Sequence, residues 1–274
     1  MLCGHTFPAD DPIDEEQLCA PGGLRCVEVL VEAASTMDRA RELAADPATS
    51  LPAAVIADRQ TAGRGRRGAG WWQPPGSLAV SIVVDGSATL DGPQPIWSLA
   101  CGIAVAETIR MLEPALDPRV RWPNDVEVDG RKLAGILVET AAGGRAIFGI
   151  GVNTSGSAAD APPALQPRVA TLPDLTGRML ARQRFVTEFV PRLLDLLAAA
   201  SVPADVARRY RPLCGLTGRP IRVYAGDRVH EGTCRGIADD GGLVVEAAAG
   251  TVVIRSGSLA APGTEWHNDS GEPR

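Results

Sequence analysis

The chain has 274 residues, of which 45% are hydrophobic and 22% charged, with a formal net charge of −6. This length suits one large domain plus a small one, and the composition is ordinary for a globular protein. The negative charge argues against broad binding of nucleic acid, and the lack of about eighteen consecutive apolar residues argues against a transmembrane helix. We therefore expect neither a nucleic acid nor a membrane as partner.

The N-terminal stretch, residues 1–24, is acidic and contains proline. It lacks the basic start and apolar core of a signal peptide, and we predict a flexible leader. The six cysteines form no CxxC pair and the three histidines lie far apart, so no metal site is predicted. Without a secretory signal we expect reduced thiols in a cytoplasmic protein.

A strand is predicted over residues 25–32, followed by a helix over residues 36–45. Ser35 precedes the helix as an N-cap, with Asp38 at the third position. The free N–H groups of a helix N-terminus also bind ligands, so capping and ligand binding both remain open for Ser35. Residues 53–57 form a short buried strand.

An arginine- and glycine-rich loop follows at residues 59–72. No acidic residue occurs from Arg59 to Val84, while four arginines do. Glycine allows close backbone approach and arginine provides forked donors for phosphate or carboxylate, so we predict an anion-binding loop. The alternative is a solvent-exposed loop. Gly63, Gly65 and Gly68 match G-x-G-x-x-G, but no helix can begin in the following Trp- and Pro-rich segment, which excludes a dinucleotide fold.

A β-hairpin is predicted around Asp129-Gly130, a two-residue turn signal between apolar strands. It follows a strand at 77–84 and a buried helix at 96–112. Asp125 lies at the start of the first hairpin strand, and Lys132 lies near the start of the second, so the two share one neighbourhood. Lys132 is the only lysine in the chain. Its retention suggests a task for a compact ammonium, although chance is the alternative.

The C-terminal half begins with a buried strand at 145–152, which ends at Asn153, either a turn residue or a ligand-binding amide. A proline-containing loop at 154–177 precedes a helix at 181–199, which Pro191 should kink or break, and a second helix at 202–210. From Gly218 the chain shows short strands at 221–224, 230–236, 243–246 and 251–255, which predict a small β-barrel. Residues 263–274 read as a disordered tail.

Three motifs, taken in order, resemble those of the biotin–protein ligases: residues 60–68 (QTAGRGRRG), 122–125 (WPND) and 131–137 (RKLAGIL). Ser35-Thr36 and residues 149–153 fit the same family, and the match covers about residues 25–262. The resemblance implies an α+β fold, in which a mixed sheet flanked by helices, similar to class II aminoacyl-tRNA synthetases, forms a catalytic domain at 25–213. A small SH3-like β-barrel follows at 214–262.

The resemblance also implies a two-step reaction. Biotin's carboxylate attacks the α-phosphate of ATP to give biotinyl-5′-AMP and pyrophosphate, with Mg²⁺ carried by ATP. A lysine on the biotin carboxyl carrier domain of an acetyl-CoA or pyruvate-type carboxylase then attacks the acyl carbon.

Site residues carried over from the resemblance form three overlapping sets. The catalytic set is Lys132, Arg66 and Asp125. The biotin-binding set is Ser35, Thr36, Met37, Gln60, Arg64, Gly65, Arg66, Lys132 and Gly135. The ATP- and adenylate-binding set is Arg64, Arg66, Arg67, Trp71, Asn124, Lys132 and Asn153.

The chain departs from the family pattern at Ala69, where arginine is usual, and at Arg121, where lysine is common. Ala69 alone leaves open a ligand-binding relative without catalysis. A lipoate ligase on the related fold is a second alternative. A transcriptional regulator is disfavoured, because only about 24 residues precede the first strand, too few for a helix-turn-helix, and this segment is acidic overall. A monofunctional ligase is therefore expected.

Overall fold

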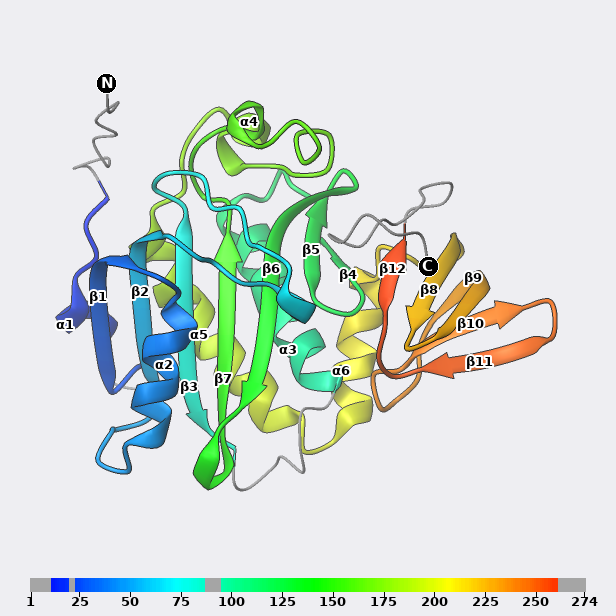
Figure 1. Cartoon of the computed structure of the whole chain (residues 1–274), viewed down its shortest axis with the longest axis horizontal. Coiled ribbons are helices and arrows are strands. Elements are labelled where there is room, and N and C mark those ends of the chain that lie inside the picture. Colours follow the sequence, from blue (N-terminus) through cyan, green and yellow to red (C-terminus); the bar gives the residue numbers. More distant parts are fainter. Residues whose placement is uncertain (1–10, 20–22, 87–94, 261–274) are drawn as a thin grey trace.

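The computed structural model describes residues 11–19, 23–86 and 95–260. Its centre is a seven-stranded mixed sheet in the order β1-β2-β3-β7-β6-β5-β4 (Figure 1). Only β1 and β2 run parallel; the remaining neighbours are antiparallel. The strands are β1 Cys26–Ala33, β2 Ala53–Gln60, β3 Leu78–Asp85, β4 Arg119–Arg121, β5 Asp125–Val128, β6 Arg131–Thr140 and β7 Arg145–Val152. The predicted α+β class with a mixed sheet is confirmed.

Helices cover both faces of this sheet (Figure 1). Helix α2, Thr36–Ala45, packs on one face against β2, β3 and β7, while α3, Pro95–Leu112, packs on the other with α5, Arg182–Ala199. Helix α6, Pro203–Tyr210, contacts α3 and α5. The short helices are α1 Glu15–Leu18, α4 Leu172–Thr176, and the 3₁₀ turns η1 Arg66–Gly68, η2 Ala142–Gly144, η3 Ala158–Asp160 and η4 Arg211–Leu213.

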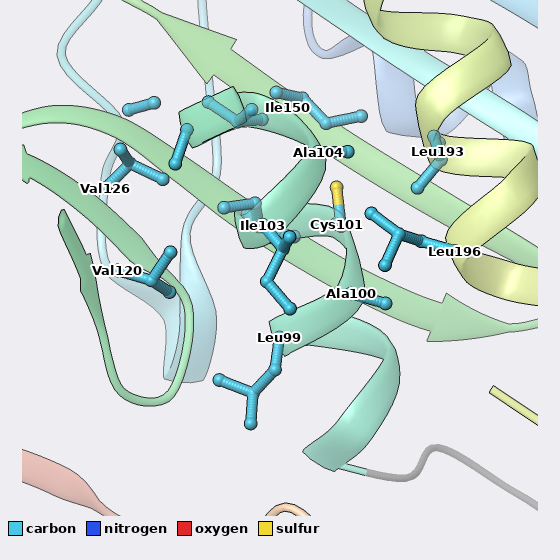
Figure 2. Packing of buried hydrophobic residues seen from close by; sticks show 14 of the residues in the cluster. Leu99, Ala100, Cys101, Ile103, Ala104, Val120, Val126, Ile150, Leu193 and Leu196 are labelled. Atoms are coloured by element: carbon cyan, nitrogen blue, oxygen red, sulfur yellow. The ribbon is translucent and has the colours of Figure 1, made fainter. Parts of the chain in front are cut away.

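Helix α3 is the centre of the main hydrophobic core. Figure 2 shows its Ile103 between Val120 and Val126 of the sheet on one side and Leu193 and Leu196 of α5 on the other. All of these side chains are fully buried. By length and composition α3 also passes as a membrane span, but 72% of it is buried inside the structure, as expected for the core helix of a globular protein.

The C-terminal segment forms a second, five-stranded antiparallel sheet in the order β11-β10-β9-β8-β12 (Figure 1). The strands are β8 Pro220–Ala225, β9 Arg228–Ile237, β10 Leu243–Ala247, β11 Gly250–Ile254 and β12 Ser258–Ala260. The four predicted strands are present, but the barrel is not closed within the described residues, since β12 pairs with β8 and not with β11. β12 was missed because three residues carry too little alternation.

Part of the predicted flexible leader is instead ordered and packed. Asp11 is buried and its Oδ2 accepts hydrogen bonds from the backbone N and the Nε of Arg182, both at 3.0 Å. Arg182 Nη1 also lies 2.6 Å from Asp58 Oδ1. This buried ion-paired cluster joins the leader, α5 and β2, so the prediction of flexibility was wrong for residues 11–19.

Helix α5 differs from the prediction of a break, since it runs as one helix through Pro191. Phe185, Phe189 and Leu193 on the same helix are fully buried, and this packing outweighs the one backbone hydrogen bond that proline cannot donate. The predicted tail at 263–274 lies outside the described residues.

The Asp11–Arg182 pair gives a stability test. Arg182→Leu leaves a buried carboxylate without its cation, so we expect the free energy of unfolding to fall by about 3 kcal/mol or more. Urea unfolding followed by circular dichroism measures the change. Arg208→Ala, which removes only an exposed helix ion pair with Asp205, is the control and should stay within about 0.5 kcal/mol. Equal losses in both variants would contradict the packed leader.

Candidate active site

A cavity of about 490 Å³ opens on the sheet face that carries α2. It is enclosed by the N-terminus of α2, the arginine-rich loop, the β5–β6 hairpin and β12. Its volume lies within the range of small-molecule sites, roughly 300–1,000 Å³. Residues of β3, β7 and the loop at 165–169 also line the cavity, which therefore collects residues from many separate parts of the chain.

The floor of the cavity is made by glycines on neighbouring strands. Gly135 of β6 and Gly151 of β7 are direct partners in the sheet, and Gly149 lies two residues before Gly151. A Cβ atom at Gly149 would lie 2.6 Å from Met37 Sδ, and one at Gly151 would lie 2.4 Å from the Trp71 ring. Glycine is thus required at both positions for Met37 and Trp71 to lie flat on the sheet.

The polar end of the cavity lies at the start of α2. Ser35 caps the helix by accepting from Met37 N at 3.4 Å, as its position before the helix predicted. Gln60, the last residue of β2, accepts hydrogen bonds at its Oε1 from the backbone N of Thr36 at 3.0 Å and from Thr36 Oγ1 at 3.3 Å. The Gln73 side chain accepts from Gln60 N at 3.1 Å and fixes this strand end.

Three of the four loop arginines, Arg64, Arg66 and Arg67, have different surroundings. Arg64 Nη2 lies 2.6 Å from Asp38 Oδ1, and this hydrogen bond holds the pKa of the Asp38 carboxyl below its ordinary value. Arg67 points outward and donates to Ser258 Oγ at 2.9 Å.

Arg66 turns inward, where its Nη1 lies 3.2 Å from Gly257 O and 3.4 Å from Asn124 Oδ1. Burial lowers the pKa of its guanidinium, and the nearby charge of Arg67 acts in the same direction. Within the described residues Arg66 forms no ion pair with a carboxylate. A cation held mainly by neutral oxygens in a cavity wall is suited to binding an anion.

Lys132 lies on the hairpin, whose turn has φ values of 52° at Asp129 and 73° at Gly130, as the Asp-Gly signal predicted. Its Nζ lies 2.7 Å from Asp125 Oδ1 and 5.3 Å from the centroid of the Trp71 ring. The predicted meeting of Asp125 and Lys132 is therefore observed. The ammonium is held over an aromatic face and is free to exchange its carboxylate partner for a ligand oxygen.

A second ion pair lies in the same wall, with Arg121 Nη1 3.0 Å from Glu127 Oε1. Burial is the main cause that raises the pKa of Glu127, while Arg121 lowers it. Glu127 is also the direct sheet partner of Lys132. This part of the sheet thus carries two carboxylates, Asp125 and Glu127, and each is already paired with a cation.

Most of the predicted site residues line the cavity together. They are Ser35, Thr36, Met37, Gln60, Arg64, Gly65, Arg66, Trp71, Asn124, Asp125, Lys132 and Gly135. Arg67 and Asn153 lie outside the lining. Asn153 is buried and donates from Nδ2 to Ala170 O at 2.8 Å, so in this structure it supports the cavity wall.

Sequence reasoning missed several lining or supporting residues. Asp38 was assigned only as part of a helix start, and Glu127, Arg168 and Leu259 were given no role. An acidic residue two positions after Asp125 on the same strand face was a usable signal for Glu127. Nothing in the local sequence marks Leu259, because its place in the wall depends on how the second sheet packs.

Comparisons with known proteins agree with this geometry. The family model described as "Biotin/lipoate A/B protein ligase family" matches residues 33–154, and "Biotin protein ligase C terminal domain" matches residues 216–259. A biotin–[acetyl-CoA-carboxylase] ligase of Mycobacterium tuberculosis is 32% identical over 92% of this chain and 95% of its own. The chain belongs to the biotin protein ligase family. The resemblance inferred from the motifs is confirmed.

Other relatives support the same assignment. A biotin–[acetyl-CoA-carboxylase] ligase of Paracoccus denitrificans is 32% identical over 82% of this chain and 96% of its own. Among solved structures, the biotin protein ligase of Aquifex aeolicus in complex with biotin and ATP has a TM-score of 0.76 at 24% identity, covering 86% of this chain and 98% of that one. The fold of this ligase, including its C-terminal sheet, is therefore that of the family.

The glycine floor gives the first test of the site. Gly151→Ala places a Cβ against the Trp71 ring, so the ring must leave its position and loosen the loop that carries it. We expect amide hydrogen exchange of residues 63–71 to rise about tenfold, which corresponds to about 1.4 kcal/mol of lost loop stability. Gly70→Ala is the control, because a Cβ there meets nothing within 4 Å. Unchanged exchange in Gly151→Ala would show that Trp71 does not hold the loop.

Proposed function

We propose that this ligase forms biotinyl-5′-AMP from biotin and ATP and transfers the biotinyl group to a lysine of a biotin carboxyl carrier protein. The observation that carries the proposal is the half-buried Arg66 guanidinium, which lacks a carboxylate partner among the described residues and lies near the Lys132–Asp125 pair. The relatives named as biotin–[acetyl-CoA-carboxylase] ligases support the same activity.

The first step must bring two anions together. A carboxylate and a phosphate about 4 Å apart repel by about 4 kcal/mol at an effective dielectric constant near 20. Lys132 offsets this repulsion by moving its ammonium from Asp125 to the reacting oxygens, and Arg66 holds the phosphate side. Arg64 is more fully neutralised by Asp38 and orients the ligand from the side of α2.

Biotin is proposed to bind between the N-terminus of α2 and the glycine floor. Its polar ring atoms face Ser35, Thr36 and Gln60, and its apolar ring surface lies on Met37. Gly65 and Gly135 allow the valeryl chain to pass close to the backbone toward Lys132. This arrangement aims the carboxylate at the two cations.

The adenylate is proposed to bind beside the Trp71 ring, with Asn124 and Arg67 on the phosphate side. Asn153 supports the wall through Ala170, and its Oδ1 has no hydrogen-bond partner among the described residues. This oxygen is buried behind the cavity lining, so the proposed contact with the adenine amino group requires the wall to move when the nucleotide binds. Closure of the loop over the adenylate excludes water from a reactive acyl phosphate.

Mg²⁺ is proposed to enter with ATP. Among the described residues no three His, Cys, Asp or Glu side chains form a metal-binding group, and the cavity carboxylates Asp125 and Glu127 are both paired with cations. The chain therefore fits a metal carried mainly by phosphate oxygens, which is how Mg²⁺ is usually bound.

In the second step, the transfer of biotin, the Asp125 carboxylate takes a new role after Lys132 has left it in the first step. When Lys132 turns to the phosphate, Asp125 loses its partner and is free to position the incoming lysine amine, which attacks the acyl carbon with loss of a proton and departure of AMP. We propose a carrier domain of an acetyl-CoA or pyruvate-type carboxylase as acceptor, and a cytoplasmic location in which ATP and this acceptor occur together.

A lipoate ligase is the second candidate, because the matching family model includes lipoate enzymes. Both acids have a carboxylate for Lys132, but lipoate lacks a ureido group for Thr36 and Gln60. Competition of biotin and lipoate in ATP–pyrophosphate exchange separates the two functions. We expect biotin alone to support exchange at micromolar concentration.

The role of Lys132 is tested by Lys132→Ala. Loss of the ammonium should lower biotin-dependent ATP–pyrophosphate exchange about 100-fold or more, as expected for removal of one electrostatic stabiliser. Arg131→Ala is the matched control, since Arg131 is the neighbouring cation but does not line the cavity. Equal activity of Lys132→Ala and the wild type would contradict the proposed role.

The proposed closure of the arginine-rich loop over the bound ligands is tested by limited trypsin digestion. Biotin with ATP should slow cleavage after Arg64, Arg66 and Arg67 about tenfold or more, because bound anions fix their side chains and close the loop. Cleavage after Arg228, an exposed residue of the second sheet, is the internal control and should not change. Equal protection at both places would indicate a global effect instead of a lid.

A further inference from the structure

Ser81 is a polar residue in the middle of β3, where the other core positions are apolar. It has no solvent exposure and is the direct sheet partner of Gly149, the glycine beneath Met37. Its Oγ donates to Thr36 Oγ1 at 2.7 Å. A buried hydroxyl is costly unless it is hydrogen-bonded, so this contact explains how a serine is tolerated at the centre of the sheet.

The direction of the hydrogen bonds follows from the backbone. The Thr36 backbone N–H can only donate, so the Gln60 atom that faces it at 3.0 Å is the oxygen Oε1. The Thr36 hydroxyl has one proton, which points to the same oxygen at 3.3 Å. Ser81 must then be the donor in its contact with Thr36. The chain of donors runs from Ser81 to Thr36 to Gln60.

This direction determines what the two cavity residues offer to a ligand. Thr36 Oγ1 retains one lone pair as an acceptor, and the Gln60 amide presents its Nε2 group as a donor. No protein acceptor for Nε2 is found in the described part of the chain. A ureido group has one oxygen acceptor flanked by two N–H donors, which is the complementary pattern.

We propose that Ser81 is a positioning residue for recognition of the ureido ring of biotin, a role that rests on the proposed function. By donating to Thr36 Oγ1, it directs the threonine proton to Gln60 and keeps the remaining lone pair turned to the ligand. Hydrogen bonds in such a chain also polarise one another, which strengthens the terminal contacts. Ser81 itself does not touch the ligand.

The experiment compares steady-state ATP–pyrophosphate exchange of the wild type and Ser81→Ala. We expect KM for biotin to rise about three- to tenfold, the range of one net hydrogen bond, with KM for ATP and kcat within about twofold. Ser81→Cys, which keeps a weak donor in a slightly larger side chain, should give an intermediate KM for biotin and also serves if Ser81→Ala folds poorly. Thr108→Val is the control, since Thr108 is another fully buried hydroxyl and has no partner among the described residues.

A double variant separates positioning from a structural role. Once Thr36→Val has removed the intermediate hydroxyl, adding Ser81→Ala should not raise KM for biotin further. An additive rise, an equal rise in KM for ATP, or an unchanged KM in Ser81→Ala would overturn the proposal for Ser81. Failure of the wild type itself to show biotin-dependent exchange would instead overturn the proposed function.

Discussion

The site depends on the half-buried guanidinium of Arg66, which has no carboxylate partner among the residues that the structure describes. Arg66 is held by Gly257 O from the second sheet and by Asn124 Oδ1 from the start of the hairpin. Carbonyl and amide oxygens fix the position of the cation without neutralising it, whereas the neighbouring Arg64 is neutralised by Asp38. The loop, the hairpin and the turn before β12 therefore meet at Arg66, so the proposed anion site depends on how the C-terminal sheet packs.

Two other cations of the cavity, Lys132 and Arg121, form ion pairs with carboxylates. Lys132 pairs with Asp125, and Arg121 pairs with Glu127, on adjacent strands of one sheet face. This arrangement avoids a cluster of like charges in the empty site. In the proposed mechanism it also couples the two reaction steps, because the movement of Lys132 toward the phosphate frees the Asp125 carboxylate for the transfer step.

Local signals predicted the parts of the site that lie on continuous segments. The Asp129-Gly130 turn and the single lysine were sufficient to place Lys132 beside Asp125, and the helix cap at Ser35 was visible for the same reason. The parts that failed depend on distant partners. Asp11 is ordered by Arg182, 171 residues away, and Arg66 is held by a carbonyl of the second sheet. Asn153 occupies the position that the family resemblance marks for ligand binding. Its side-chain amide instead donates to Ala170 O, a backbone carbonyl in the cavity wall that is distant in sequence.

The central claim is that biotin's own carboxylate oxygen attacks the α-phosphorus of ATP. The most direct measurement uses biotin labelled with ¹⁸O in both carboxylate oxygens, a purified carrier domain and mass spectrometry of the products. The account predicts AMP carrying one ¹⁸O and a biotinyl-lysine amide carrying the other. AMP without label, with ¹⁸O instead in pyrophosphate or phosphate, would contradict it.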